Sequence, residues 1–198
     1  MTTQKHYPLS EFKPLTADLL QLVWQWRNQS EIRRNMHNDA LISWDQHINW
    51  FEAQQHNPSR RFYVFFQDGR PIGVLNFSQL AKGVLEWGCY LGETNVWPGS
   101  GLLLEIAALD YAANNESTNI LYAEVLSFNH SVIKMHQLFG YQPMPDKPGA
   151  TRENEAYQVK VFEYPVTAWR QNREAILAKL PKQIAAAAAR IKFYQQQV

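Results

Sequence analysis

The stretch from Leu85 to Ala113, LEWGCYLGETNVWPGSGLLLEIAALDYAA, constrains the fold more than any other part of the chain. Its first part is apolar and aromatic with almost no charge, which predicts a buried strand. A glycine-rich turn follows at 98–101, and the residues after it are apolar on nearly every face of a helical pattern. Glycines let the backbone approach a ligand, the first amides of a helix lack partners, and the helix dipole is positive there. We therefore expect a phosphate-bearing ligand on residues 96–102.

Two other glycine-loop motifs do not fit this turn. A P-loop needs Lys and then Ser or Thr after its last glycine, but Leu102 and Leu103 stand there. The dinucleotide-binding fingerprint needs a third glycine and a series of βαβ units, and neither is visible. From these residues alone, an ordinary strand-to-helix turn remains the alternative.

Composition bounds the function. The chain has 198 residues, a formal net charge of +1 and one cysteine. This length fits one domain with a sizeable core, and the balanced charge argues against a nucleic-acid partner. One cysteine excludes an intramolecular disulfide framework, and we expect Cys89 to be a reduced core residue rather than a nucleophile. Residues 1–10 are polar and no apolar run reaches bilayer length, so we expect a cytoplasmic protein with no membrane partner.

Local patterns before the glycine turn predict helices and then a meander. Thr16 is a suitable N-cap for a helix through Asn28, and a shorter helical piece follows at 31–36. Ser43 and Gln46 match a capping box that opens a helix to about residue 55. Antiparallel strands are predicted at 61–67, 71–80 and 85–91, with Asp68-Gly69 as the first hairpin turn.

After the central helix the pattern predicts a strand at 119–126, a helix from the N-cap Asn129 to the C′ residue Gly140, and a last strand at 157–164. The last strand is expected to pair near Tyr141. The whole order predicts an α+β domain over residues 1–164 with a mixed sheet.

Residues 165–198 are predicted to be a helical C-terminal extension, interrupted at Pro181, which can open a second helix. Its apolar face could pack on the body of the protein or on a partner subunit, and we hypothesise a partner, hence a homodimer. This face comprises Trp169, Ile176, Leu177, Leu180, Ile184 and Ile191.

With strand, glycine turn, helix, strand and Asn-capped helix in this order, the chain resembles the GCN5-related N-acetyltransferases (GNAT). Their phosphate motif, Arg/Gln-x-x-Gly-x-Gly/Ala, is matched at 96–101 with both glycines, but Val96 replaces Arg or Gln. Their motif Asn-x-x-Ala-x-x-Leu-Tyr-Glu-x-x-Gly-Phe is matched at 129–141, where His136 replaces the usual tyrosine. The resemblance covers about 12–164 and implies a central mixed, mostly antiparallel sheet flanked by helices.

A narrower resemblance is to the nucleotide-sugar branch, which includes the N-acetyltransferase for UDP-4-amino-4,6-dideoxy-N-acetyl-β-L-altrosamine in pseudaminic acid biosynthesis. Other relatives acetylate protein N-termini, notably of ribosomal proteins, and share the early Trp-Arg. The matching positions are Trp26, Arg27, Asn28, Ile32, Arg33, Met36, His47, Trp50, Phe51, Ile72, Gly73, Trp87, Gly88, Tyr90, Leu91, Gly92, Glu124, Val125 and Asn129.

The resemblance implies acetyl-CoA as co-substrate, with its pantetheine arm in a slot between two splayed strands. Backbone amides near Tyr90 and Leu91 would bind the acetyl carbonyl, and Asn129 would either reach the pantetheine or only cap its helix. The amides implied to hold the phosphates are those of Trp97, Gly99, Ser100, Gly101 and Leu102.

Glu124 is the best general-base candidate, because it stands in the apolar strand YAEVL, where burial is expected to raise its pKa. A carboxylate at the solvent edge is the alternative. His136 occupies the position of the family's general acid, with Tyr90 as a second candidate for protonating the leaving thiolate. A single histidine on a helix is otherwise a packing or surface residue.

The acceptor is expected to contact charged and aromatic residues, since arginine fits phosphate oxygens with its bidentate fork. Each charge could equally be solvated. No histidine or cysteine spacing suggests a metal site. The candidates for the acceptor's diphosphate, uridine and sugar are Trp26, Arg27, Arg33, His47, Phe77 and Lys82.

These observations predict an N-acetyltransferase that moves acetyl from acetyl-CoA to a UDP-linked amino sugar by direct attack. A protein N-terminal acetyltransferase is the second possibility. A non-catalytic acetyl-CoA-binding module is the third, and the departures at Val96 and His136 are its support.

Overall fold

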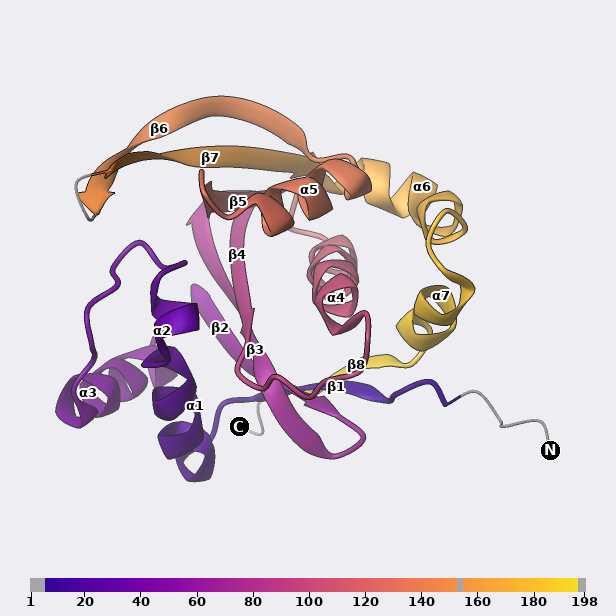
Figure 1. The fold of residues 1–198 in the computed structure, drawn as a ribbon. Helices are drawn as coiled ribbons and strands as arrows, with labels where there is room; N and C mark the ends of the chain where they lie inside the picture. The colour runs from indigo at the N-terminus through magenta and orange to yellow at the C-terminus, as the bar shows by residue number, and fades with distance from the viewer. Residues whose placement is uncertain (1–5, 153–154, 196–198) are drawn as a thin grey trace.

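The computed structural model describes residues 6–152 and 155–195. One mixed sheet runs through the molecule in the strand order β6-β7-β5-β4-β3-β2-β1-β8 (Figure 1). The strands are β1 Ser10–Pro14, β2 Arg60–Gln67, β3 Arg70–Ala81, β4 Val84–Leu91, β5 Ile120–Leu126, β6 Gln142–Arg152, β7 Glu155–Pro165 and β8 Ile191–Phe193. The helices are η1 Ala17–Leu19, α1 Leu20–Arg27, α2 Ser30–Arg33, α3 Trp44–Gln55, α4 Ser100–Asn114, α5 His130–Phe139, α6 Val166–Leu177 and α7 Lys182–Ala188.

Strands β2, β3 and β4 form the predicted antiparallel meander. Asp68 and Gly69 make the first turn with φ of 50° and 82°, which explains the Asp-Gly sequence. β5 lies beside β4 in parallel, and β7 pairs antiparallel with β5 while β6 forms the outer edge. The observed α+β architecture with a mixed sheet confirms the predicted fold class.

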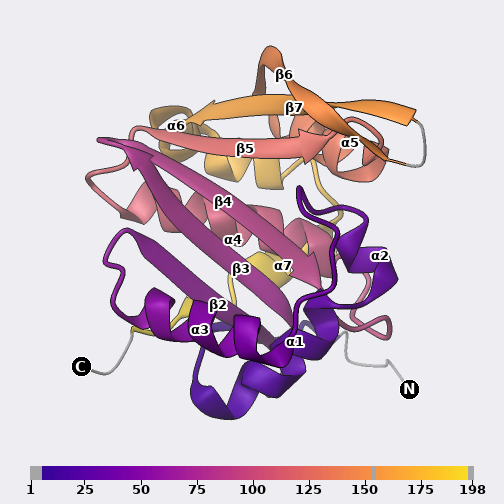
Figure 2. The ribbon, with the colours of Figure 1, turned by 90° about the vertical axis from the view of Figure 1, so that its left-hand side faces the viewer.

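Helices cover the sheet on both faces. The N-terminal helices α1 to α3 lie on one face, and α4 with α6 and α7 lies on the other (Figure 2). α4 is buried on nearly every side, as its apolar sequence predicted, and forms the centre of the main core with the sheet. A second cluster joins Val23 and Trp26 of α1 to Phe51 of α3 and to Val64 and Val74 of the sheet.

Of the two N-caps predicted for the N-terminal helices, the one at Ser43 is observed and the one at Thr16 is not. Ser43 accepts a hydrogen bond from the Gln46 amide, and the Gln46 side chain accepts one from the Ser43 amide, which confirms the capping box of α3. Thr16 makes no side-chain cap. The 3-10 turn Ala17–Leu19 intervenes, so α1 begins only at Leu20.

The C-terminal extension packs on its own chain. Trp169 is 1% exposed, and its indole nitrogen donates to Asp110 of α4 at 2.8 Å. Leu177, Leu180 and Ile184 also belong to the main core. The prediction of helix throughout is wrong at Ile191, because Ile191–Phe193 form β8, parallel to β1. Most of the predicted apolar face is thus covered within one chain, and the last residues, 196–198, lie outside the described part.

No helix in the described ranges 6–152 and 155–195 is both long and apolar enough to span a membrane.

Candidate active site

The pairing between β4 and β5 ends early, at the position where the family resemblance implies a slot for the pantetheine arm. The two strands pair only at the start, from Val84–Glu86 against Ile120–Tyr122, and then part. The Gly92 amide donates a hydrogen bond to the Ile72 carbonyl of β3. In an antiparallel ladder, residues whose peptide groups face one neighbouring strand alternate with residues whose peptide groups face the other. The N–H groups of Trp87, Cys89 and Leu91 therefore point toward the β5 side. The Leu91 amide thus points toward the β5 side, and its role in binding the acetyl carbonyl stays a prediction, whereas alternation turns the Tyr90 amide toward β3.

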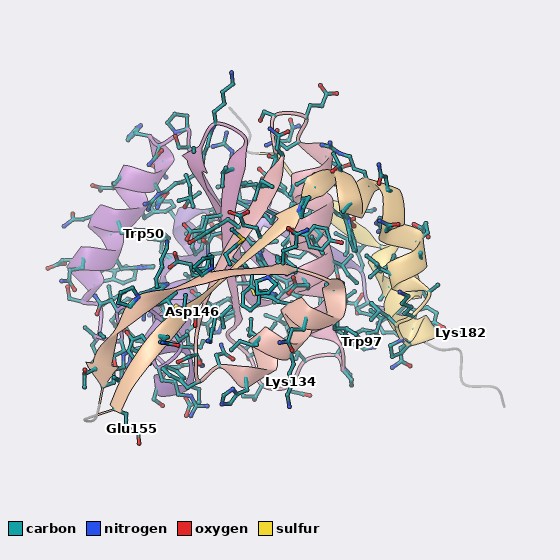
Figure 3. The ribbon with its side chains drawn as sticks, turned by 90° about the horizontal axis from the view of Figure 1, so that it is seen from above. Trp50, Trp97, Lys134, Asp146, Glu155 and Lys182 are labelled. Atoms are coloured by element: carbon teal, nitrogen blue, oxygen red, sulfur yellow. The ribbon has the colours of Figure 1, made fainter. Side chains whose placement is uncertain are left out.

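The glycine turn lies where β4 runs into α4. Gly99 is the N-cap with a φ of 110°, and a Cβ there would approach Ile184 Cδ1 to 2.3 Å and the Trp97 ring to 3.0 Å. Figure 3 shows Trp97 on the side of the molecule where α7 begins at Lys182. The positive φ favours glycine at this turn, and a Cβ would also require the side chains of Ile184 and Trp97 to shift.

The amides of this turn lack hydrogen-bond acceptors in the described chain, with one exception. Among the residues described, the N–H groups of Trp97, Gly99, Gly101 and Leu102 have no backbone or side-chain acceptor. The Ser100 amide instead donates to Trp97 O at 3.0 Å, and its hydroxyl bonds Gln67 and Trp97. Ser100 is 1% exposed, so we correct its predicted role: it builds the turn, and four amides remain for an anion.

Cys89 follows Trp87 on the α4 face of β4 and is exposed, so the predicted core position is wrong. The slot accounts for this, since β5 no longer covers the strand there. Surrounding protein nevertheless raises the pKa of the Cys89 thiol to about 12, through burial first and the charge of Glu105 second.

The sheet face opposite α4 carries the polar side chains near the slot. Leu85 and Trp87 of β4 enter the main core, so alternation places Glu86 and Tyr90 on the other face. In the same way Tyr122 and Glu124 of β5 face away from α4. Ser78 and Asn76 of β3 pair with Glu86 and Gly88 and extend the same polar face. We call this face the polar floor; it comprises Asn76, Ser78, Glu86, Tyr90, Tyr122 and Glu124.

Glu124 is held by three groups. Its Oε1 accepts hydrogen bonds from Tyr122 and from Lys147, both at 2.5 Å, and its Oε2 lies 3.2 Å from His37 Nε2. Burial acts to raise the pKa of Glu124, but the bonds to Lys147 and Tyr122 and the nearby charges outweigh it and hold the pKa below its ordinary value. The predicted upward shift is therefore wrong: Glu124 is an ionised carboxylate at neutral pH.

Glu86, which pairs with Tyr122 across the strands, shows the opposite behaviour. Burial first and the charge of Glu124 second raise its pKa. The polar floor therefore holds two carboxyl groups whose pKa values are shifted in opposite directions, a pattern typical of sites that transfer protons.

Arg152, near the tip of the β6–β7 hairpin, was not among the site residues predicted from the sequence. Its guanidinium donates to the carbonyls of Arg34, Met36 and His37, and it lies 3.3 Å from Asp39. It thereby ties the hairpin to the segment after α2, which also carries His37 to Glu124. No local pattern marks Arg152, since its partners lie more than a hundred residues earlier.

The structure places three predicted acceptor residues in the protein interior. Trp26 is 2% exposed, stacks over Gly92 and donates to Glu93 at 2.9 Å. His47 is 3% exposed with Nε2 3.1 Å from Leu20 O, and burial lowers its pKa. Phe77 stacks on Tyr111 at 4.1 Å in the main core. These side chains shape the fold and are not presented to a ligand.

Lys82 lies in the turn before β4, at the end opposite the glycine turn, and β4 spans about 23 Å at ~3.3 Å per residue. It is not brought together with the other candidates.

The two predicted arginines lie beside the polar floor. Arg33 donates to Asn28 O and Asp39 O and so fixes the segment after α2. Arg27 donates to Asn38 O at 2.7 Å, while its Nη1 is buried with no partner in the described chain. The neighbouring phenol, Tyr90, has its pKa raised by burial, so it keeps its proton.

The two remaining candidates come from α5. Asn129 is the N-cap, but its side chain does not cap the helix; it accepts from Ser131 at 3.1 Å instead. His136 is 1% exposed and points into the interior, with Nδ1 3.1 Å from Glu105 of α4.

Neither a metal-binding cluster nor a cavity adds to the predicted site residues in the described part of the chain. No group of three His, Cys, Asp or Glu side chains that could hold a metal ion occurs in the described ranges. A cavity of about 1010 Å³ between α3, the start of β2 and β8 contains none of the predicted site residues.

Comparison with known proteins identifies the family. A family described as acetyltransferase (GNAT) domain matches residues 11–142. Two proteins named Acetyltransferase PseH, from two strains of Campylobacter jejuni subsp. jejuni, are 28% and 26% identical over 129 residues, covering 65% of this chain and 80% of each relative.

Solved structures share the fold. Spermidine N-acetyltransferase from Vibrio cholerae, in complex with CoA and spermine, superimposes with a TM-score of 0.74 at 15% identity, covering 82% of this chain and 98% of that one. RimL, a ribosomal L7/L12 alpha-N-protein acetyltransferase in complex with CoA, gives 0.66 at 11% identity, covering 79% and 94%. Because the family match spans more than half of the chain, this protein belongs to the GNAT acetyltransferase family and is an acetyl-CoA-dependent N-acetyltransferase.

Proposed function

We propose that the acceptor is the 4-amino group of a UDP-linked amino-dideoxy sugar, of the kind acetylated in pseudaminic acid biosynthesis. The observation that carries this proposal is the polar floor beside the slot, where Glu86, Tyr122 and Glu124 offer several hydrogen-bonding groups to a hydroxylated ring. The relatives named Acetyltransferase PseH and the matches to the nucleotide-sugar branch support it.

The coenzyme's diphosphate would bind the four available amides of the turn, at the positive end of α4. Its pantetheine arm would lie in the slot, with Leu91 and Asn129 as contacts and the acetyl carbonyl on a β4 amide. Fixing both reactants in one geometry supplies much of the rate enhancement of such a transfer. Tyr90, on the floor, would contact the acceptor through its neutral phenol.

The acceptor amine would attack the thioester directly. Glu124, ionised at neutral pH, would take a proton from the amine, either directly or through a water. His136 would return a proton to the leaving thiolate. Arg27 would bind the acceptor's diphosphate, because its buried Nη1 has no partner in the described chain, while Arg33 and Arg152 hold the segment that carries His37.

The protein would act in the cytoplasm, where acetyl-CoA and nucleotide sugars are made. A homodimer is compatible with the structure, but it would use a surface other than the apolar face that α6 and α7 bury within the chain.

The test is a thiol-release assay with acetyl-CoA and a panel of UDP-sugars that differ in the position of the amino group. Release with a 4-amino sugar alone supports the proposal. Release only with peptides beginning in a free amine would instead assign a protein acetyltransferase. Absence of acetyl-CoA binding by calorimetry would contradict the coenzyme site itself.

A further inference from the structure

A buried polar cluster lies on the α4 side of the slot. Glu105 of α4 and His136 of α5 are each 1% exposed, with Oε2 and Nδ1 3.1 Å apart. The imidazole stacks on the Tyr141 ring at 4.4 Å and lies 5.7 Å from the Trp87 ring of β4. These four residues, the Glu105 cluster, come from α4, α5 and β4 and from Tyr141, which lies between α5 and β6.

The Glu105 cluster contains polar atoms without partners. Glu105 Oε1, Tyr141 OH and Trp87 Nε1 are all buried and make no hydrogen bond with a described residue. Burial first and the Glu105 carboxylate second raise the pKa of Tyr141, so its phenol stays protonated. Buried polar groups are nearly always satisfied, and a buried carboxylate is costly when it only holds a fold together. A functional reason for this carboxylate is therefore needed.

The position of the cluster supplies that reason. Trp87 is the first residue of β4 beyond its last pair with β5, so its indole marks the closed end of the slot. Cys89, two residues further on, is open to the slot, and the charge of Glu105 contributes to raising its pKa. The carboxylate and the imidazole thus lie on the α4 side of β4, against the part of the strand that follows its last pair with β5.

We propose that Glu105 is a positioning residue that orients His136 to protonate the coenzyme's leaving thiolate. The proposal rests on the direct transfer described above. With Nδ1–H donated to Glu105, the other ring nitrogen, Nε2, is left to carry the acidic proton, as in other carboxylate–histidine pairs. The pair replaces the tyrosine that the resembled family carries at this position.

The step balances without a further reactant. As the carbon–sulfur bond breaks, sulfur keeps the electron pair and takes the Nε2 proton, and the imidazolium becomes a neutral imidazole. The nitrogen of the new amide loses its extra proton to Glu124. After the products leave, the Glu124 proton passes to solvent and the imidazole takes one back.

The first experiment compares Glu105→Gln with the wild type, using whichever amine the wild type acetylates. With acetyl-CoA we expect kcat to fall about 100-fold while KM changes less than about 2-fold. With acetyl-seleno-CoA the loss should shrink to about 3-fold or less, because a selenolate leaves without needing a proton. If Glu105 had only a structural role, Glu105→Gln would lower kcat equally with acetyl-CoA and with acetyl-seleno-CoA, and that result would overturn the proposal.

Asp110→Asn is the matched control. Asp110 is another acidic residue of α4, paired with Arg173 at 2.7 and 2.9 Å on the side of α6. We expect this variant to lose thermal stability but to keep its kcat with both esters. A fall in kcat as large as that of Glu105→Gln would mean that any lost α4 charge has this effect.

A second pair of variants keeps the test decisive if Glu105→Gln folds poorly. His136→Phe should show the same difference between thioester and selenoester. His136→Tyr should restore turnover with acetyl-CoA, and adding Glu105→Gln to it should change kcat less than about 2-fold. Equal activity of His136→Phe and wild type would refute the assignment, whereas inactivity of the wild type on UDP-sugars would refute only the proposed acceptor.

Discussion

The ammonium nitrogen of Lys147 lies 2.5 Å from Oε1 of Glu124. Lys147 belongs to the outer strand β6 and Glu124 to the strand that borders the slot, so the hairpin reaches over β7 to the proposed base. His37 approaches the other oxygen from the N-terminal side. Two distant parts of the chain therefore set the charge of one carboxylate.

Replacing Lys147 by methionine should raise the pKa of Glu124, because the bond and charge that lower it are removed. The acidic limb of kcat/KM should then move to higher pH. Since a lowered carboxyl pKa adds stability that is lost as pH falls through its folded value, the variant should also be less stable near pH 7 and similar in strong acid. Lys160→Met, which removes a pair with Asp146 in the same hairpin, is the control and should leave the limb in place. A limb unchanged in Lys147→Met would contradict the assignment of Glu124.

Gly99→Ala should weaken acetyl-CoA binding by at least about 10-fold in calorimetry, because the turn must move to admit a Cβ. The strain should also cost ~1–3 kcal/mol in urea unfolding. Gly69→Ala has a similar positive φ but open space around its Cβ, so it should lose stability without losing the coenzyme. Equal affinity of the two variants would argue against the turn as the phosphate site.

Cys89 is the one cysteine of the chain and can report on the slot directly. With a pKa of about 12, it should react slowly with iodoacetamide at pH 7 and faster as pH rises, since the thiolate is the nucleophile. Desulfo-CoA, which carries no thiol of its own, should slow this reaction by covering the side chain. Mass spectrometry gives the rate, and alkylation unaffected by saturating desulfo-CoA would place the pantetheine elsewhere.

Arg152→Ala should raise KM for the acceptor while leaving KM for acetyl-CoA within about 2-fold, because it releases the segment that carries His37 to the floor. The matched control is Arg170→Ala, which removes another guanidinium bound to backbone carbonyls, those of Ala113 and Asn115. Initial rates with each substrate varied in turn give both constants. If both variants had the same KM for the acceptor, the hydrogen bonds from Arg152 to the segment after α2 would have no specific role in acceptor binding.

Sequence patterns predicted what depends on neighbours along the chain. The capping box of α3, the turn at Asp68, the burial of α4 and the glycine turn all follow from residues a few positions apart. The slot came from family resemblance, because strand separation depends on pairing between segments. The downward pKa shift of Glu124 and the bridge made by Arg152 were not predictable, since their partners are far away in sequence. β8 was hidden because a three-residue strand after an alanine run has no pattern of its own.

The contact between Ile184 and Gly99 also has a consequence for biosynthesis. The loop proposed to receive the diphosphate packs against α7, which the ribosome makes only after β1 to β7, and β8, which pairs with β1, follows α7. A nascent chain therefore remains without its finished anion cradle until translation has passed Phe193. Chains terminated before α7 should consequently fail to retain coenzyme A, and a CoA-affinity resin would separate them from chains that include β8.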